Sequence, residues 1–276
     1  VIFVIYERRH NDPMVPMELF RNRTFLGTNL LTLLLYGALA GALFFMPLNL
    51  QQIQGYSALQ AGFALLPFSI LLMTLSPWTG KMAIKYGPRR FLVLGPITVG
   101  LGFIGFALPG ITAGAVAYWW TYFPGGILFG IGMGLTVAPL TSTVMSSVSS
   151  TRSGTASGIN NAISRSAGVL ATAIMGGIAL VAFRSYLGAA LAESALASDA
   201  VSAVMEGAGE LAETPIPQAV PESLREAVQM HIDRSFVSVF RLMMYIGAGL
   251  AWVSALLAGI LVEKKDLQAE VKNVAT

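Results

Sequence analysis

The sequence predicts an all-α membrane protein, a bundle of six transmembrane helices. Of its 276 residues, 55% are hydrophobic and only 11% are charged, whereas soluble domains carry about 25% charged residues. The charges are also segregated, because residues 24–80 and residues 91–151 contain none. Crossing a hydrocarbon core about 30 Å thick takes about 20 helical residues. Each uncharged run is therefore long enough for two crossings.

Polar or helix-breaking clusters divide these runs. The first run breaks at residues 49–60, its one polar cluster, and the second at residues 108–115, where a proline and two glycines lie close together. Two further apolar runs follow. The six expected helices are residues 24–48, 60–80, 91–109, 117–146, 157–183 and 235–262.

The remaining segments are expected outside this bundle. Residues 1–23 begin with an apolar stretch followed by Glu7, Arg8 and Arg9, and they lack the features of a signal peptide. We expect them to be the end of a preceding transmembrane helix and a cytoplasmic linker, which makes the chain a fragment of a longer protein. Residues 184–233 are expected to form a long loop, helical in part, and residues 263–276 a tail.

The charges predict the orientation in the membrane. Under this topology the basic residues of the short loops and of both ends fall on one side, whereas residues 184–233 carry eight acidic side chains. By the positive-inside rule the basic side is cytoplasmic. We therefore expect a multi-pass protein of the cell membrane, the bacterial inner membrane in particular, with both ends of the six-helix unit in the cytoplasm. The net charge of +3 reflects basic residues that the membrane topology places, so it does not indicate binding to nucleic acid. We therefore expect the lipid bilayer, and no nucleic acid, as a partner.

Several classes of chemistry are excluded or disfavoured. The chain has no cysteine, and its two histidines, His10 and His231, lie far apart outside the apolar runs, so no metal site is expected. The string Gly100, Gly102, Gly105 fits a dinucleotide fingerprint but lies inside an expected span without a preceding strand. There is no phosphate-binding loop and no catalytic constellation. We expect neither a cofactor nor enzymatic activity.

Glycines and a proline mark the expected fourth and fifth helices as close-packed. Gly126, Gly130 and Gly134 recur every four residues, which lets two helix backbones approach closely in lipid. Pro139 follows and predicts a bend or hinge, since a proline leaves a helical carbonyl without its donor. The packing and hinge positions expected on these two helices are Gly126, Gly130, Gly134, Pro139, Gly154 and Gly158.

The order of these features resembles a known family. Six helices with a basic loop between the second and third, together with the stretches Gln51–Pro67 and Gly130–Gly168, resemble the C-terminal half of a major facilitator superfamily transporter, specifically the fourteen-helix drug–proton antiporter branch. The stretch from Gly80 to Arg90 is similar to the superfamily's loop motif, although Ile84 stands where that motif has an acidic residue. The expected gating residues of this loop are Gly80, Lys81, Lys85, Gly87, Arg89 and Arg90.

The resemblance implies a secondary active transporter that exports lipophilic or cationic drugs in exchange for protons. It implies two six-helix bundles with the small-molecule substrate between them, so an N-terminal helical half would be the main partner. The first, second, fourth and fifth helices here would line the cavity, and the third and sixth would face lipid. None of the six expected helices contains an acidic residue, so a proton-exchanging carboxylate is expected in the other half.

Arg165 has two interpretations. It lies eight residues into the fifth expected helix, about 12 Å along the axis. It can snorkel to the cytoplasmic interface, or it can act as a gate or coupling residue in the cavity. Aromatic, methionine and polar side chains are the other expected contacts with a lipophilic substrate. The cavity candidates are Asn29, Tyr36, Phe44, Phe45, Gln51, Gln52, Phe68, Met73, Thr136, Asn161 and Arg165.

Two other functions stay open. The same fold could export a metabolite, a lipid or a siderophore. A membrane protein of another class, a non-transporting sensor or scaffold, could instead use the acidic residues 184–233 as its working part.

Overall fold

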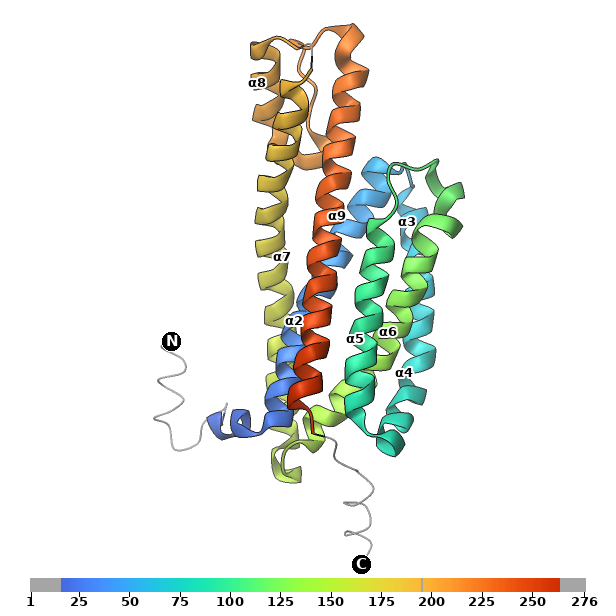
Figure 1. Ribbon diagram of the computed structural model, residues 1–276, viewed down its shortest axis with the longest axis vertical. Helices are drawn as coiled ribbons and strands as arrows, with labels where there is room; N and C mark the ends of the chain where they lie inside the picture. The colour runs from blue at the N-terminus through green and yellow to red at the C-terminus, as the bar shows by residue number, and fades with distance from the viewer. Residues whose placement is uncertain (1–15, 195, 264–276) are drawn as a thin grey trace, which may run out of the picture.

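The computed structural model describes residues 16–194 and 196–263, in which all regular structure is helical. Six of the helical segments in this part of the chain are long and apolar enough to cross a membrane. They stand side by side as a bundle (Figure 1). The expected all-α bundle of six spans is therefore confirmed. The segments expected before residue 16 and after residue 263 lie outside the described residues.

The helices follow one another with short connections. The first span consists of α2 (Arg23–Leu48) and a π-helical turn, η2 (Asn49–Ile53), and the second of α3 (Ala58–Ala64) and α4 (Leu66–Tyr86). The others are α5 (Pro88–Ala107), α6 (Tyr118–Ser146), α7 (Ser153–Ala192) and α9 (Glu222–Leu261). Short helices connect or precede them: η1 (Met17–Arg21), η3 (Gly114–Ala117), η4 (Ser150–Arg152), α8 (Ser198–Glu206) and η5 (Gly207–Glu213).

The stretch from Gly80 to Arg90 is not the loop that the sequence predicted. Helix α4 continues to Tyr86 and α5 begins at Pro88, so only Gly87 separates them. Gly87 has φ +83°, a conformation that glycine adopts without strain. Pro88 then fits the first helical position, where no backbone N–H is needed. The turn is tight because its two residues are suited to ending one helix and starting the next.

Residues 184–233 also contain more helix than the long loop that the sequence predicted. Helices α7 and α9 are 40 residues each, about 60 Å at 1.5 Å per residue, twice the thickness of a hydrocarbon core. Their ends project beyond the other helices and are capped by α8 (Figure 1). Apolar side chains recur along both helices, so the projection has its own core, with Leu187, Val204 and Ile232 fully buried. We call this part, residues 184–233, the extension.

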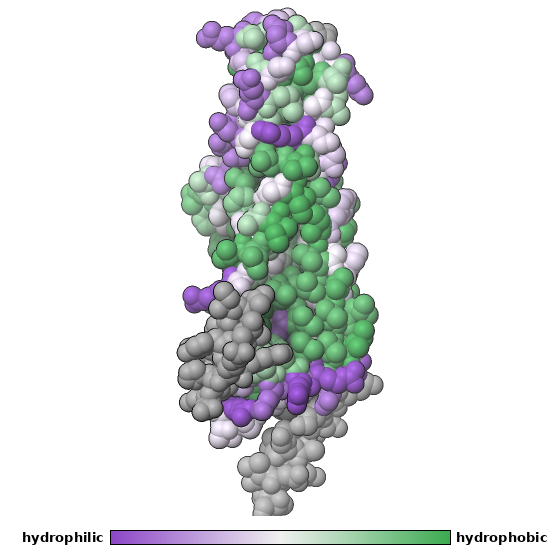
Figure 2. Space-filling view, turned by 90° about the vertical axis from the view of Figure 1, so that its left-hand side faces the viewer, coloured by the Kyte–Doolittle hydropathy of each residue, from purple (hydrophilic) through white to green (hydrophobic). Residues whose placement is uncertain are grey.

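The bundle has a central group of four helices and two flanking ones. Helix α5 packs on α6 and α9, and α9 packs on α2. Helix α4 packs mainly on α6, and α7 packs mainly on α2. The middle of the bundle has an apolar surface, and a hydrophilic band marks its lower end (Figure 2). The starts of α2, α5 and α7 lie at that end, with the arginines and lysines of the short connections. We call it the basic end.

Candidate functional site

Two of the six spans have few buried residues. In the most apolar stretch of the second span, 6% of the residues are buried, and in that of α7 the share is 22%, against 39–56% in the other four spans. Both helices expose large apolar side chains, such as Ile70 and Met73 of α4 and Val169 and Val181 of α7. We call the uncovered surfaces of α4 and α7, with the exposed residues of α2 and α6 beside them, the open face.

Five of the expected cavity residues are exposed, and four of them lie on α2, α4 and α7. Met73 on α4 is 75% exposed and Phe44 on α2 is 45% exposed. Asn161 and Arg165 are exposed on α7, one helical turn apart. Arg165 forms no ion pair or hydrogen bond with any residue in the described part of the chain. These side chains are free to meet a ligand or another part of the protein.

Three expected cavity residues are instead buried in the bundle, which corrects the prediction. Phe45 is fully buried in the core. Thr136 is also fully buried, and its hydroxyl donates to the carbonyl of Gly132 in its own helix. Asn29 is 3% exposed, and its Nδ2 donates to the carbonyl of Phe25 at 2.8 Å. Neighbouring positions on a helix point 100° apart. Composition alone does not show which of these directions faces the bundle, so the sequence did not reveal that these three residues are buried.

Asn29 belongs to a polar contact between α2 and α7 that the sequence did not reveal. Nδ2 of Asn160 donates to Oδ1 of Asn29 at 3.0 Å and lies 2.7 Å from Oγ1 of Thr32. Such side-chain hydrogen bonds hold membrane helices together. Asn160, not its neighbour Asn161, turns toward α2.

The other cavity candidates are two half-buried aromatic residues and two glutamines of η2. Tyr36 and Phe68 are half-buried, and the Phe68 ring packs edge-on against Phe129 of α6. Gln51 is exposed and donates to the carbonyl of Pro47. Gln52 donates to a carboxylate oxygen of Glu213 at 2.7 Å, so it connects the outer end of α2 to the extension.

Helix α6 uses glycines on two faces. A β-carbon at Gly134 would lie 2.8 Å from Cβ of Leu75, and one at Gly130 would lie 3.0 Å from Cβ of Leu71, so these two glycines pack on α4. Gly126 has only one atom, from the Phe106 ring, at 4.0 Å. A second set, which the sequence analysis missed, packs on α5 and includes Gly132.

Gly154 and Gly158 do not pack as expected. No atom of the described chain comes within 4 Å of a β-carbon placed on either residue. They lie near the start of α7, are exposed, and leave its backbone accessible on the open face.

Thr79 is the main polar connection between α4 and α6. It is fully buried, and its hydroxyl donates to the carbonyl of Gly134 at 2.6 Å. Next to it, Gly80 packs against Ala138. Both contacts lie within the five residues before Pro139, where a proline weakens the helix. Helix α4 is thus attached to the part of α6 that precedes the expected hinge.

We expect Thr79→Val to lower the stability of the bundle by about 1 kcal/mol, because it removes one hydrogen bond between membrane helices and keeps the side-chain shape. Thermal unfolding of the purified protein in detergent measures the effect. Thr74→Val is the matched control, since the exposed Thr74 hydroxyl bonds only to carbonyls of its own helix. An equal loss in both variants would contradict the role of Thr79 as a connection between helices.

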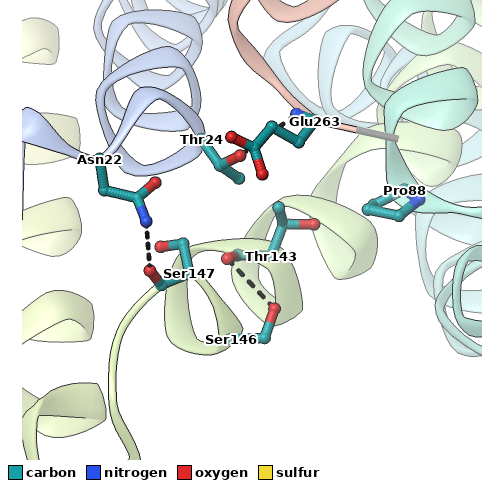
Figure 3. Close-up of a pocket in the computed structure, with 7 residues that line it drawn as sticks. All are labelled: Asn22, Thr24, Pro88, Thr143, Ser146, Ser147 and Glu263. Atoms are coloured by element: carbon teal, nitrogen blue, oxygen red, sulfur yellow. Dashed lines mark hydrogen bonds between the residues drawn. The ribbon is translucent and has the colours of Figure 1, made fainter. Parts of the chain in front are cut away.

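The ends of four helices meet at the basic end around a small polar pocket of about 50 Å³. Nδ2 of Asn22, before α2, donates to the carbonyl of Ser147 after α6 at 2.9 Å. The backbone N–H of Glu263, after α9, donates to Oγ1 of Thr24 at 3.2 Å. Pro88 of α5 completes the wall (Figure 3). These hydrogen bonds tie the helix ends together.

The expected gating residues contribute to the same end. Arg89 donates from Nη2 to the carbonyl of Gly259 and so ties α5 to α9. Lys81, Lys85 and Arg90 are exposed on the outside of the turn around Gly87.

The opposite end has its own buried polar contacts. Nδ2 of Asn49 donates to the hydroxyl of Tyr122 at 2.8 Å, joining α2 to α6. Gln54 donates to the carbonyl of Gly110 and accepts from the backbone and hydroxyl of Thr112. Tyr56, between the first two spans, is 5% exposed, and burial raises the pKa of its hydroxyl above the usual value, so it stays neutral. Polar side chains thus connect the helix ends there.

Arg241 of α9 is half-buried. Its Nε donates to the carbonyl of Ala107 at 3.1 Å and its Nη2 to that of Leu108 at 3.3 Å. The last carbonyls of a helix have no partner within it. Arg241 therefore caps the C-terminus of α5.

The arrangement contains no metal-binding group of histidines and acidic residues in residues 16–194 and 196–263. Six apolar spans tied by polar contacts at both ends, with two helices uncovered, define a multi-pass membrane protein. Residues 6–172 match the family model of the major facilitator superfamily. Because this match covers more than half of the chain, the chain belongs to that superfamily.

Curated relatives are bacterial members of the superfamily. An uncharacterised MFS-type transporter of Bacillus subtilis, YhcA, is 35% identical over 34% of this chain and 18% of its own length. The multidrug transporter protein MdtP of the same organism is 32% identical over 51% and 25%. The tetracenomycin C resistance and export protein of Streptomyces glaucescens is 24% identical over 93% and 47%. The chain thus spans about half the length of this Streptomyces glaucescens protein.

Proposed function

We propose that this chain is the C-terminal half of a secondary active transporter, of the fourteen-helix drug–proton antiporter branch, that exports lipophilic or cationic compounds. The observation that carries the proposal is the open face, where two membrane-spanning helices have few buried residues. In a membrane protein built from two bundles, such a surface is where the second bundle and a substrate would bind. The names of the relatives, which include a multidrug transporter and an antibiotic export protein, support the same substrate class.

The side chains on the open face suit a lipophilic substrate. Met73 and Phe44 supply polarizable, adaptable surface. Asn161 and Arg165 add polar groups one helical turn apart on α7. A few polar groups within an apolar surface are typical of ligand sites, because they orient a molecule that the apolar surface binds.

Proton coupling would depend on the other bundle. Helices α2, α4, α6 and α7 contain no aspartate or glutamate. A group that exchanges a proton within the membrane is usually a carboxylate. In this proposal the other half supplies the carboxylate, and the two bundles rotate relative to each other about the substrate. The basic end is cytoplasmic, as the positive-inside rule predicts.

The test is transport by the full-length protein in inside-out vesicles with an acidic interior. We expect particular lipophilic cations to be taken up and to dissipate the pH gradient, because protons leave as the compound enters. Vesicles with an empty membrane are the control. If a folded, inserted protein gives no response to cations but responds to a metabolite, lipid or siderophore, the substrate class is wrong and the fold assignment stands.

A non-transporting role is the second candidate, and the folded extension favours it. Its apolar core and its acidic surface give it the form of a small domain outside the bundle. Absence of transport for every class of solute in the same vesicles would support a sensor or scaffold that uses the extension.

A further inference from the structure

A groove lies between α2 and α7 close to the basic end. It has a volume of about 250 Å³. Leu26, Leu30 and Leu33 of α2 form one wall, and Ala162, Ile163 and Ser166 of α7 form the other.

Both polar atoms of the one amide in this groove have a hydrogen-bond partner. Asn29 contributes to the wall, but its Nδ2 donates to Phe25 and its Oδ1 accepts from Asn160. An apolar occupant therefore leaves each polar atom of Asn29 with its hydrogen-bond partner. The groove is chemically suited to a hydrocarbon chain.

The α2 wall ends in a positive charge. Arg23, Leu26, Leu30 and Leu33 are spaced three, four and three residues apart, so helical geometry places them in one stripe. Arg23 and Leu33 are ten positions apart, which is about 15 Å along the helix axis and half of a hydrocarbon core about 30 Å thick. The stripe is thus one membrane leaflet long, with its cation at the aqueous end.

This cation has no carboxylate partner in the described part of the chain. Arg21 and Arg23 are both exposed, and neither forms an ion pair with a carboxylate of the described chain. The acidic residue nearest in sequence, Glu18, is 3.4 Å from Arg152 and is paired with it. The helix η1, which carries Arg21, lies across the foot of α2 (Figure 1), and its Phe20 also lines the groove.

We propose that this groove binds an anionic phospholipid of the leaflet at the basic end, with one acyl chain between α2 and α7 and the phosphate head group at Arg23. The charge, length and apolar walls of the groove all match that molecule. Basic side chains beside clefts between membrane helices recognise anionic head groups in this way. The proposal does not depend on what the protein transports.

Native mass spectrometry tests the proposal on the full-length protein taken from vesicles of equal phosphatidylglycerol and phosphatidylcholine. We expect the wild type to retain phosphatidylglycerol preferentially. Arg23→Gln should lower this preference about five-fold, the contribution of one arginine near a membrane surface. Arg90→Gln is the matched control, because Arg90 is an exposed arginine at the same end but on α5. Equal losses in both variants, or no preference in the wild type, would overturn the proposal.

Two further variants identify the occupant. Ala162→Trp should fill the groove and reduce retention of both lipids, whereas Ala173→Trp, at an exposed position of α7 away from the groove, should not. A photoreactive phenylalanine at Leu30, in an otherwise unchanged protein, should cross-link to phospholipid. Cross-linking to a segment of the protein instead would show that the groove is covered by polypeptide, and the lipid site would be excluded.

Discussion

Gly132→Val is expected to prevent α6 from packing on α5 and to abolish accumulation of folded protein. A β-carbon at Gly132 would lie 2.5 Å from the backbone nitrogen of Val99 and 2.7 Å from the carbonyl oxygen of Gly95. Both are backbone atoms of α5, so no side-chain rotation relieves the overlap. Overpacking a core costs about 1–3 kcal/mol even where side chains can adjust, and we expect about 3 kcal/mol or more here.

Expression followed by thermal unfolding in detergent measures this effect, and Gly177→Val is the control. Gly177 also lies within a spanning helix, but no atom of the described chain comes within 4 Å of a β-carbon there. Both substitutions place a β-branched residue in a helix, so their intrinsic helix propensities are the same. If the two variants unfolded at the same temperature, close contact between α5 and α6 would not be what stabilises the bundle.

The number and order of the spans were predictable from sequence, because charge is excluded from the membrane whatever the tertiary structure. The spacing of Gly130 and Gly134 also predicted close helix packing, and these glycines do contact α4. Gly95 and Gly102 of α5, seven residues apart, lie on one helix face, and that spacing could have revealed the second packing surface of α6.

The inward side of each helix was harder to predict. Asn160 and Asn161 have the same side chain and differ by one position, yet Asn160 bonds to α2 while Asn161 is exposed. Spans that are apolar on every side give no periodic signal, because lipid and protein interior are both apolar. For this reason Asn29, Phe45 and Thr136 were placed in the cavity and are buried in the bundle. The helical ends of α7 and α9 were underestimated for a related reason, since acidic residues there indicated only that the segment leaves the membrane.

Arg165→Gln is expected to reduce transport about ten-fold or more and to leave the stability of the protein unchanged. The side chain is exposed on α7 and has no ion pair or hydrogen bond within the described chain, so its removal breaks no contact of this bundle. If it binds substrate or the other half during transport, the loss of one hydrogen bond to a charged group costs about 1.5–3 kcal/mol. Vesicle transport rates and thermal unfolding in detergent give the two measurements.

Two comparisons separate a working residue from a snorkelling one. Arg184→Gln is the matched control, because Arg184 is an exposed arginine of the same helix, 19 residues further on, where α7 enters the extension. Arg165→Lys keeps a charge that can reach the interface but loses the planar, multiple donor geometry of the guanidinium. A gate or coupling residue predicts that Arg165→Lys is impaired while Arg184→Gln transports normally. Full transport by both Arg165→Lys and Arg165→Gln would assign Arg165 to the interface, and the open face would then act through its apolar side chains alone.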